Sequence, residues 1–301
     1  MFRSYCVASV WECIMARRAR ASSARLDKLK LIPQSRRPFG CGAVRQPASA
    51  KKRQKQVQLR KAPVPVSRRC SPAILKPYNG METLDGRLAA VRERMARAAE
   101  RARRDPAGIL LLAVTKIFPA ETIREAYDLG LRDFGENYVQ EFEGKAPQLT
   151  DLEDARYHLI GHLQSNKSKR ATELFQVVQT VDSAKLARRL NESVRPLDVM
   201  LEVKLSGEEA KSGAAFAELP ELIAAVRACG NLRLLGLMTM PPWSDDPEAA
   251  RGYFRRLREL AEEHGLAQLS MGMSHDLETA IEEGSTCVRV GTALFGKRKK
   301  P

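Results

Sequence analysis

The sequence from residue 81 onward predicts an α/β fold, a single (β/α)8 barrel of the TIM type that occupies residues 81–301. Short aliphatic runs alternate with stretches of helical spacing, and such alternation makes neighbouring strands pair in parallel. Eight of these units are enough to close a barrel. An open doubly wound sheet is the alternative, but no Gly-x-Gly-x-x-Gly follows the first strand to support it. The predicted strands are residues 109–116, 131–135, 157–161, 175–181, 199–204, 232–240, 269–271 and 287–290.

The helical stretches have their own periodicity. Leu84, Leu88, Val91 and Met95 recur every three or four residues. This spacing predicts one apolar stripe on a helix that Asp105-Pro106 ends. Further helices are predicted at residues 119–129, 182–194, 218–229, 247–264 and 275–283.

The basic charge of the chain, +15 over 301 residues, is concentrated in its first 80 residues. That segment holds 19 of the 51 lysines and arginines, and only two of the 36 acids, Glu12 and Asp27, which leaves 32 bases against 34 acids in residues 81–301. It also contains Pro-rich and Arg-rich runs without sustained periodicity. We therefore expect residues 1–80 to be a disordered basic extension and residues 81–301 to be the barrel domain.

Three interpretations of this extension remain open. It is either an upstream stretch outside the working protein, with Met81 as the natural start, or an organelle transit peptide, because residues 1–23 are Arg-rich and nearly without acids. A nucleic-acid-binding arm is the third, although the basic run at residues 51–61 has no aromatic side chains to stack on bases. The expected location is cytoplasmic, or mitochondrial if the extension is a transit peptide.

The barrel portion has no sequence signs of a membrane span, a disulfide framework or a zinc site. No apolar run approaches the roughly 20 residues needed to cross a bilayer, so a soluble domain is expected. Cys229 and Cys287 lack the spacing of paired cysteines or metal ligands. A reducing compartment is therefore expected.

The first predicted strand ends in Lys116, a candidate functional residue. The preceding run is short and rich in aliphatic residues, which is typical of a strand buried on both faces. At the point where a parallel strand leaves the sheet, a lysine amine points into the crevice where such folds bind ligands. The alternative is a surface lysine whose charged end reaches solvent.

The last two strands run into loops that predict a phosphate site. Ser274 stands at the expected N-cap of the helix at residues 275–283, where a hydroxyl and unpaired amides can bind an anion. After the eighth strand, Gly291 allows close backbone approach and Thr292 adds a hydroxyl at the start of a helical turn. An ordinary helix cap is the alternative for Ser274 alone. Barrels of this type often bind phosphate after their seventh and eighth strands.

Arg289 lies in the middle of the eighth strand, on the face opposite to Val288 and Val290. An arginine there keeps its proton and needs an acceptor, either a structural carboxylate or a ligand. In a closed barrel the eighth strand pairs with the first, so Lys116 and the phosphate site are expected on adjacent strand ends. A ligand with a phosphate at one end and a carbonyl at the other is implied, because a lysine in a partly apolar pocket can form a Schiff base. Pyridoxal 5'-phosphate (PLP) has that shape.

Several motifs occur in order along the chain: Ala113-Val114-Thr115-Lys116, Phe134-Gly135-Glu136-Asn137-Tyr138-Val139-Gln140-Glu141, Ile160-Gly161-His162-Leu163-Gln164-Ser165-Asn166-Lys167, Lys211-Ser212-Gly213, Gly236-Leu237-Met238, Ser270-Met271-Gly272-Met273-Ser274, and Val288-Arg289-Val290-Gly291-Thr292 with Phe295-Gly296. Together they resemble the pyridoxal phosphate homeostasis protein family, over residues 81 to about 298.

This resemblance implies a barrel like the N-terminal domain of alanine racemase, with PLP held on Lys116. By motif match it also implies Asn137 near the cofactor ring, Met238 against a ring face, Arg289 near the pyridine nitrogen, and Ser274, Gly291 and Thr292 on the phosphate. His162 matches less closely, because some family members have proline there, and a loop histidine that caps a helix is the alternative. His158 is expected to be structural.

The resemblance further implies a carrier rather than an enzyme. A permanently charged arginine at the pyridine nitrogen weakens the ring as an electron sink, and racemisation needs a second base from a further domain, which is not expected here. We expect intracellular PLP homeostasis without catalytic residues, turnover or a metal. A PLP-dependent racemase or lyase, or a Schiff-base aldolase, is the alternative. The expected partners are PLP and apo-PLP enzymes, and the protein is expected to be a monomer without nucleic-acid or membrane partners.

Overall fold

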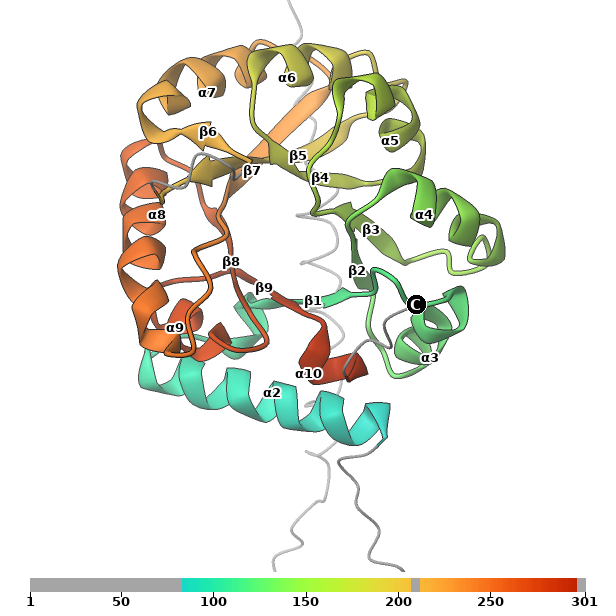
Figure 1. Ribbon diagram of the computed structural model, residues 1–301, viewed down its shortest axis with the longest axis vertical. Helices are drawn as coiled ribbons and strands as arrows, with labels where there is room; N and C mark the ends of the chain where they lie inside the picture. Colours follow the sequence, from blue (N-terminus) through green and yellow to red (C-terminus); the bar gives the residue numbers. More distant parts are fainter. Residues whose placement is uncertain (1–82, 207–211, 297–301) are drawn as a thin grey trace, which may run out of the picture. The chain divides into compact units, whose positions relative to one another are not determined.

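The computed structural model describes residues 83–206 and 212–296; the extension predicted for residues 1–80 lies outside them. The barrel strands are β1 (Leu110–Val114), β2 (Asp133–Glu136), β3 (Arg156–Leu159), β4 (Val177–Val181), β5 (Leu197–Lys204), β7 (Leu232–Met238), β8 (Gln268–Met273) and β9 (Cys287–Val290). Within the described ranges these eight strands pair in parallel in the order β4-β3-β2-β1-β9-β8-β7-β5. A further pairing of β4 with β5 closes the ring, as predicted, so the open-sheet alternative is wrong (Figure 1).

Helices surround the barrel, with α2 lying across α9 and α10 (Figure 1). They are α2 (Leu84–Arg101), α3 (Ala120–Asp128), α4 (Val139–Lys145), α5 (Ser168–Leu174), α6 (Ala184–Leu190), α7 (Leu219–Arg227), α8 (Arg251–Glu263), α9 (Leu277–Glu282) and α10 (Thr292–Phe295). The predicted stripe of α2 is buried, and Thr83 caps the helix by accepting a hydrogen bond from the Gly86 amide.

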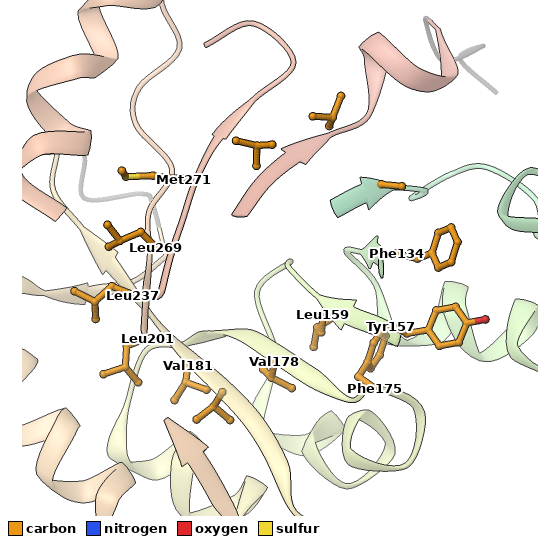
Figure 2. Packing of buried hydrophobic residues seen from close by; sticks show 14 of the residues in the cluster. Phe134, Tyr157, Leu159, Phe175, Val178, Val181, Leu201, Leu237, Leu269 and Met271 are labelled. Atoms are coloured by element: carbon orange, nitrogen blue, oxygen red, sulfur yellow. The ribbon is translucent and has the colours of Figure 1, made fainter. Parts of the chain in front are cut away.

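Two apolar clusters follow from the alternation of side chains along the strands. The larger one joins strand residues such as Leu237 and Val288 to the surrounding helices. Figure 2 shows how neighbouring strands contribute to this layer side by side. The smaller one contains only strand and strand-end residues, Leu112, Val114, Ile160 and Cys287, and forms part of the inside of the barrel. Along each strand, the residues that alternate with those of the larger cluster therefore face the barrel interior, where the candidate functional groups lie.

Some observed boundaries differ from the predicted ones. The strand predicted to reach residue 240 ends at Met238, and the hydroxyl of the next residue, Thr239, donates to the Val203 carbonyl at 2.8 Å. A two-residue strand, β6 (Ala214–Ala215), was not predicted from the sequence and pairs with the end of β5. The helix predicted from residue 275 begins at Leu277.

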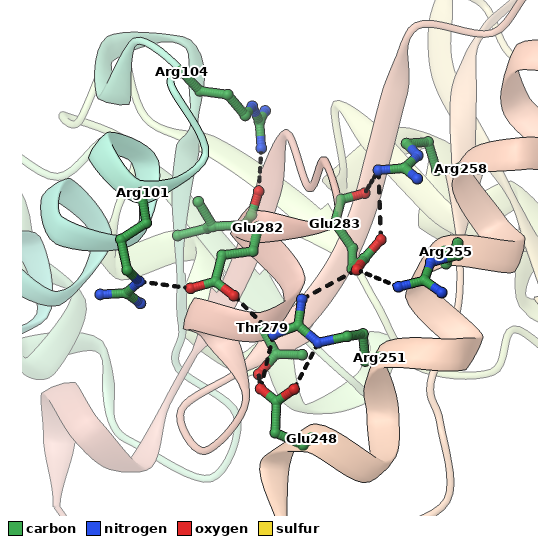
Figure 3. A network of polar contacts seen from close by, with 10 residues as sticks. Arg101, Arg104, Glu248, Arg251, Arg255, Arg258, Thr279, Glu282 and Glu283 are labelled. Atoms are coloured by element: carbon green, nitrogen blue, oxygen red, sulfur yellow. Dashed lines mark hydrogen bonds and ion pairs between the residues drawn. The ribbon is translucent and has the colours of Figure 1, made fainter.

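A cluster of ion pairs joins α2, α8 and α9 outside the barrel (Figure 3). Arg251 contacts Glu248, Glu282 and Glu283, and Arg101 of α2 contacts the second of these at 2.7 Å. Because α9 follows β8 directly, this cluster fixes the outer side of one of the predicted phosphate loops.

The described part of the chain, residues 83–206 and 212–296, has no helix long and apolar enough to cross a membrane. Cys229 and Cys287 are both free and buried. Burial raises the pKa of the Cys287 thiol to about 11, so this side chain stays protonated and unreactive at neutral pH.

Candidate functional site

The residues singled out from the sequence gather at the ends of the barrel strands. Lys116 follows β1 and is half-buried, and Asn137 follows β2. Met238 is the last residue of β7 and is 1% exposed. The pairing of β1 with β9 sets Leu112 beside Arg289. The predicted neighbourhood of the lysine strand and the arginine strand is therefore confirmed.

The two predicted phosphate loops also lie side by side. Ser274 Oγ accepts a hydrogen bond of 3.2 Å from the Ala293 amide, which links the turn after β8 to the first turn of α10. Gly291 is the N-cap of α10 and Thr292 opens this helix, as predicted. Ser274, however, is not the N-cap of α9, because Asp276 occupies that position and accepts from the Met273 amide at 2.6 Å. The Ser274 hydroxyl instead joins the loops to each other.

Helix α2 holds these loops from outside the barrel. Arg94 donates to both carboxylate oxygens of Glu278 at 2.6 and 2.7 Å and to the Ser274 carbonyl at 3.0 Å. Arg87 donates to the Leu294 carbonyl in α10. A bidentate arginine fixes direction as well as distance, so the positions of the two loops depend on a helix far away in sequence.

Arg289 is a buried cation, only 3% exposed. Its Nη1 donates to Ser270 Oγ at 2.8 Å and its Nη2 donates to the Thr239 carbonyl at 2.9 Å. Within residues 83–206 and 212–296 it forms no ion pair with a carboxylate, so the structural ion pair considered for Arg289 is not found there. Burial lowers the pKa of the guanidinium from its usual value, but arginine remains charged in proteins. A ligand carrying negative charge or a lone pair would compensate this cation.

A chain of buried polar side chains stands behind Arg289 across the barrel interior. Ser270 Oγ donates to Gln179 Oε1 at 2.7 Å, and Gln179 Nε2 contacts His158 Nδ1 at 3.0 Å. His158 Nε2 lies 3.0 Å from Asp133 Oδ1. Because burial lowers the pKa of His158, the neutral imidazole accepts from Gln179 and donates to Asp133. Each member is thereby satisfied, and the chain holds the guanidinium in one orientation.

The lysine loop is anchored by a second buried cluster. Lys145 of α4 contacts Glu136 at 2.9 Å, Glu141 at 2.6 Å and the Thr115 carbonyl at 3.1 Å. Thr115 Oγ1 donates to Glu136 Oε1 at 2.7 Å, and Glu141 accepts from the amide of Ile117. Both peptide neighbours of Lys116 are therefore held by one ion-pair cluster.

This anchoring accompanies an unusual backbone conformation next to Lys116. Ile117 has a φ of +70°, in the left-handed region that β-branched residues rarely adopt. Such strain persists only where surrounding contacts over-determine it. Phe118 then packs on Phe295 of α10, with ring centroids 5.3 Å apart, so the lysine loop and the loop after β9 support each other.

A cavity of about 210 Å³ lies at the ends of β2, β3, β5 and β7. Asn137, His162 and Glu202 belong to its wall. His162 does not cap a helix: the following turn has Gln164 as N-cap, and His162 Nδ1 lies 3.5 Å from Asp182 Oδ2. Gly161 is required here, because a Cβ would stand 2.2 Å from the Asn137 carbonyl oxygen.

Sequence reasoning missed Glu202, Thr239, Gln179 and the Glu136–Lys145 pair. Glu202 did leave a signal, since it interrupts an aliphatic strand at a position that faces the barrel interior, together with Met200. The others were not recognisable, because their partners come from separate strands or helices. Gln179, for example, is paired with residues of β3 and β8.

Comparisons with known proteins agree on one family. The family model described as alanine racemase, N-terminal domain, matches residues 87–299. A pyridoxal phosphate homeostasis protein of Pseudomonas aeruginosa is 50% identical over 224 residues, which cover 72% of this chain and 97% of that protein. The protein of the same name from Escherichia coli K12 is 43% identical over 236 residues, covering 72% and 98%.

Solved structures give the same assignment. PipY of Synechococcus elongatus, determined with PLP bound, is 38% identical with a TM-score of 0.63, and the match covers 71% of this chain and 100% of that chain. Alanine racemase from Corynebacterium glutamicum is 20% identical with a TM-score of 0.52, over 70% of this chain and 61% of that one, and shares the fold. The chain therefore belongs to the pyridoxal phosphate homeostasis protein family, on a barrel of the alanine racemase N-terminal type.

Proposed function

We propose that this protein binds PLP on Lys116 and acts in intracellular PLP homeostasis without catalytic turnover. The observation that carries the proposal is the meeting of three features at one barrel mouth. A lysine ends β1, a buried arginine lies in the adjacent β9, and two loops joined through Ser274 follow β8 and β9. Family membership and the PLP in the PipY structure support the proposal of PLP binding.

The residues present fit this cofactor. Arg289 is a buried cation that needs an electron-rich partner, which the pyridine nitrogen offers. Ser274, Gly291 and Thr292 would hold the phosphate, because hydroxyls and exposed amides at turns favour anions. Asn137 would lie near the ring and Met238 against one ring face. When bound, PLP supplies an aldehyde that forms a Schiff base with a lysine amine.

Arg289 disfavours catalytic turnover. Its donors are fixed by Ser270 and the Thr239 carbonyl, so a permanently charged group would face the pyridine nitrogen and disfavour its protonation. The ring is then a poor electron sink. We accordingly propose no catalytic residue in this chain, and apo-PLP enzymes as recipients of the cofactor.

An absorption spectrum of the full chain with PLP tests the binding proposal. We expect a band near the visible edge that borohydride bleaches, with the reduced adduct mapped to Lys116. Lys116→Ala should lose the band and the adduct but keep weaker, phosphate-dependent affinity, whereas Lys185→Ala, at an exposed position on α6, should behave like the unaltered protein. An adduct that persists in Lys116→Ala would refute the assignment of the lysine.

Incubation of the PLP-loaded protein with L-alanine distinguishes a carrier from a racemase. A carrier leaves the enantiomer unchanged over hours, which chiral chromatography would show. Conversion to the racemate at a rate proportional to protein concentration would favour the racemase instead.

A further inference from the structure

The cavity at the ends of β2, β3, β5 and β7 is lined by different residues from those proposed to hold PLP. Asn137 is the one residue common to both sets. Glu202, Val203 and Met240 form the wall on the β5 and β7 side. The cavity therefore extends beyond the proposed cofactor contacts and can be considered as a site of its own.

Two oxygen atoms of residues that line this cavity have no hydrogen-bond donor among the described residues. They are Glu202 Oε2 and Asn137 Oδ1, both buried. Glu202 as a whole is 5% exposed. A buried polar atom without a partner costs about 1–3 kcal/mol, and more if the group is charged. Because both atoms are acceptors, the missing partner is a group that donates hydrogen bonds.

Several charged groups surround the Glu202 carboxyl. Burial raises its pKa most strongly, Asp182 after β4 raises it further and Arg289 of β9 lowers it, to give a pKa of about 7. Lys204 of β5 and His162 after β3 line the same cavity. The carboxyl is thus close to the balance between its neutral and ionised forms, and a cation placed against it would favour the ionised form.

The cavity is also connected to both key strands of the proposed site. Thr239 donates to the Val203 carbonyl at 2.8 Å and accepts from Arg289 at 2.9 Å. On the other side, Asn137 follows β2, whose Gly135 is paired with Val114 of β1. The cavity is therefore linked to Arg289 through Thr239 and to the lysine strand through β2.

We propose that this cavity binds the ammonium group of a small primary amine, with Glu202 Oε2 and Asn137 Oδ1 as its acceptors. A volume of about 210 Å³ compares with about 30 Å³ for one water in the liquid, so a short alkylamine fits. An anion would oppose the carboxylate, and an ether or ketone would leave both oxygens without donors. Such an amine would compete with Lys116 for a carbonyl ligand, and this role rests on the proposed function. The binding of the amine to the cavity does not depend on that function.

The test is a calorimetric titration of n-propylamine into the full chain without PLP, at pH 5 to 8. We expect one saturable site whose affinity falls as Glu202 becomes protonated, approaching tenfold per pH unit below pH 6. The titration near pH 7 is repeated in two buffers that differ in ionisation enthalpy and are not primary amines. Binding should release a fraction of a proton from Glu202 to the buffer. Binding without pH dependence or proton release would overturn the proposal.

Variants and matched ligands identify the acceptor. Glu202→Gln should weaken propylamine binding at pH 8 by tenfold or more and abolish the pH dependence, whereas Glu192→Gln, an exposed carboxylate on the β4–β5 connection, should change neither. Propionate and 1-propanol should show no saturable binding. Equal affinity in Glu202→Gln, or tighter binding of propionate, would refute the site. If Glu202→Gln does not fold, the preference of the unaltered protein for propylamine over propionate and 1-propanol decides.

A parallel titration in Lys116→Ala separates this inference from the proposed function. We expect amine binding there to match the unaltered protein, since Lys116 is not an acceptor in the site. In the unaltered protein, no visible band with PLP but normal amine binding would overturn the proposed function and leave the cavity assignment standing. A normal band with no amine binding would do the opposite.

Discussion

At the scale of single residues, Lys116, the proposed cofactor lysine, is positioned by its neighbours in the chain. Thr115 and the amide of Ile117 are both bound by the Glu136–Lys145–Glu141 cluster. Glu136 is fully buried and Lys145 is 8% exposed. A buried ion pair contributes little net stability over an apolar pair, but removal of one member leaves an uncompensated charge. The cluster therefore sets the geometry of the lysine loop more than it stabilises the fold.

Replacement of Lys145 by methionine should consequently be harmful. We expect Lys145→Met to lower the free energy of unfolding by about 3–5 kcal/mol, because Glu136 is left buried and unpaired. Urea unfolding followed by circular dichroism measures this change. The double change with Glu136→Gln should recover part of the loss, and Lys169→Met, at an exposed position on α5, serves as the control. A loss in Lys145→Met no larger than in the control would contradict the assigned role.

At the scale of elements, α9 is the point where the outer helices meet. Glu283, at the end of α9, is 7% exposed in its side chain and contacts Arg251, Arg255 and Arg258 of α8. Figure 3 shows these arginines converging on it. On the other face of α9, Arg94 of α2 binds Glu278. The turn that carries Ser274 immediately precedes this helix, so contacts outside the barrel hold a loop of the proposed phosphate site.

The stability contributed by Glu283 should depend on pH. Burial alone would raise its pKa, but the hydrogen bonds from Arg255 and Arg251 outweigh this and hold the pKa below the usual value of 4.5. A depressed folded-state pKa means that the contribution is complete above about pH 4.5 and is lost as the pH falls through the folded-state value.

Glu283→Gln tests this linkage. It should lower the free energy of unfolding at pH 7 by about 1–3 kcal/mol, with the difference from the unaltered protein shrinking below pH 4. Urea denaturation at several pH values gives the result. Glu263→Gln, exposed on the last turn of α8, should leave the profile unchanged, and a pH-independent deficit in Glu283→Gln would argue against the ionised contacts.

At the scale of the whole molecule, the sequence predicts the barrel because each unit repeats the same local pattern. Leu112 and Val114 mark a strand with two buried faces, and the Leu88 stripe marks an outer helix, without knowledge of any partner. The adjacency of the Lys116 and Arg289 strands was predictable, because a lysine after β1 and an arginine within β9 are distinctive in aliphatic strands. The prediction of Ser274 as N-cap was wrong, because Asp276, two residues later, takes the N-cap position of α9.

What remained unpredictable depends on contacts between distant segments. Arg94 reaches the Ser274 carbonyl across 180 residues, and the series of hydrogen bonds from Asp133 to Arg289 involves five strands. No local pattern marks such pairs, since each residue looks like an ordinary polar residue in its own strand. Closure of the barrel brings them together.

The basic extension gives a prediction at this scale. The described ion pairs that anchor the lysine loop and α9 join residues within 83–206 and 212–296. A chain that starts at Met81 should therefore unfold at the same urea midpoint as the full chain and show the same PLP band. Loss of salt-dependent DNA or RNA binding on this truncation would support a nucleic-acid arm, and a lower midpoint would show that the extension takes part in the fold.

The pairing of β1 with β9 has a consequence for biosynthesis. A ribosome delivers the lysine strand early and the arginine strand last, so the two cannot meet until nearly the whole polypeptide has left the exit tunnel. Long-range parallel pairing is also intrinsically slow, because the intervening chain must be ordered first. A stalled or prematurely terminated nascent chain would carry Lys116 without Arg289 or the loop after β9, and so would lack part of the proposed PLP site. Under the proposed function, we therefore expect only the finished protein to hold the cofactor firmly.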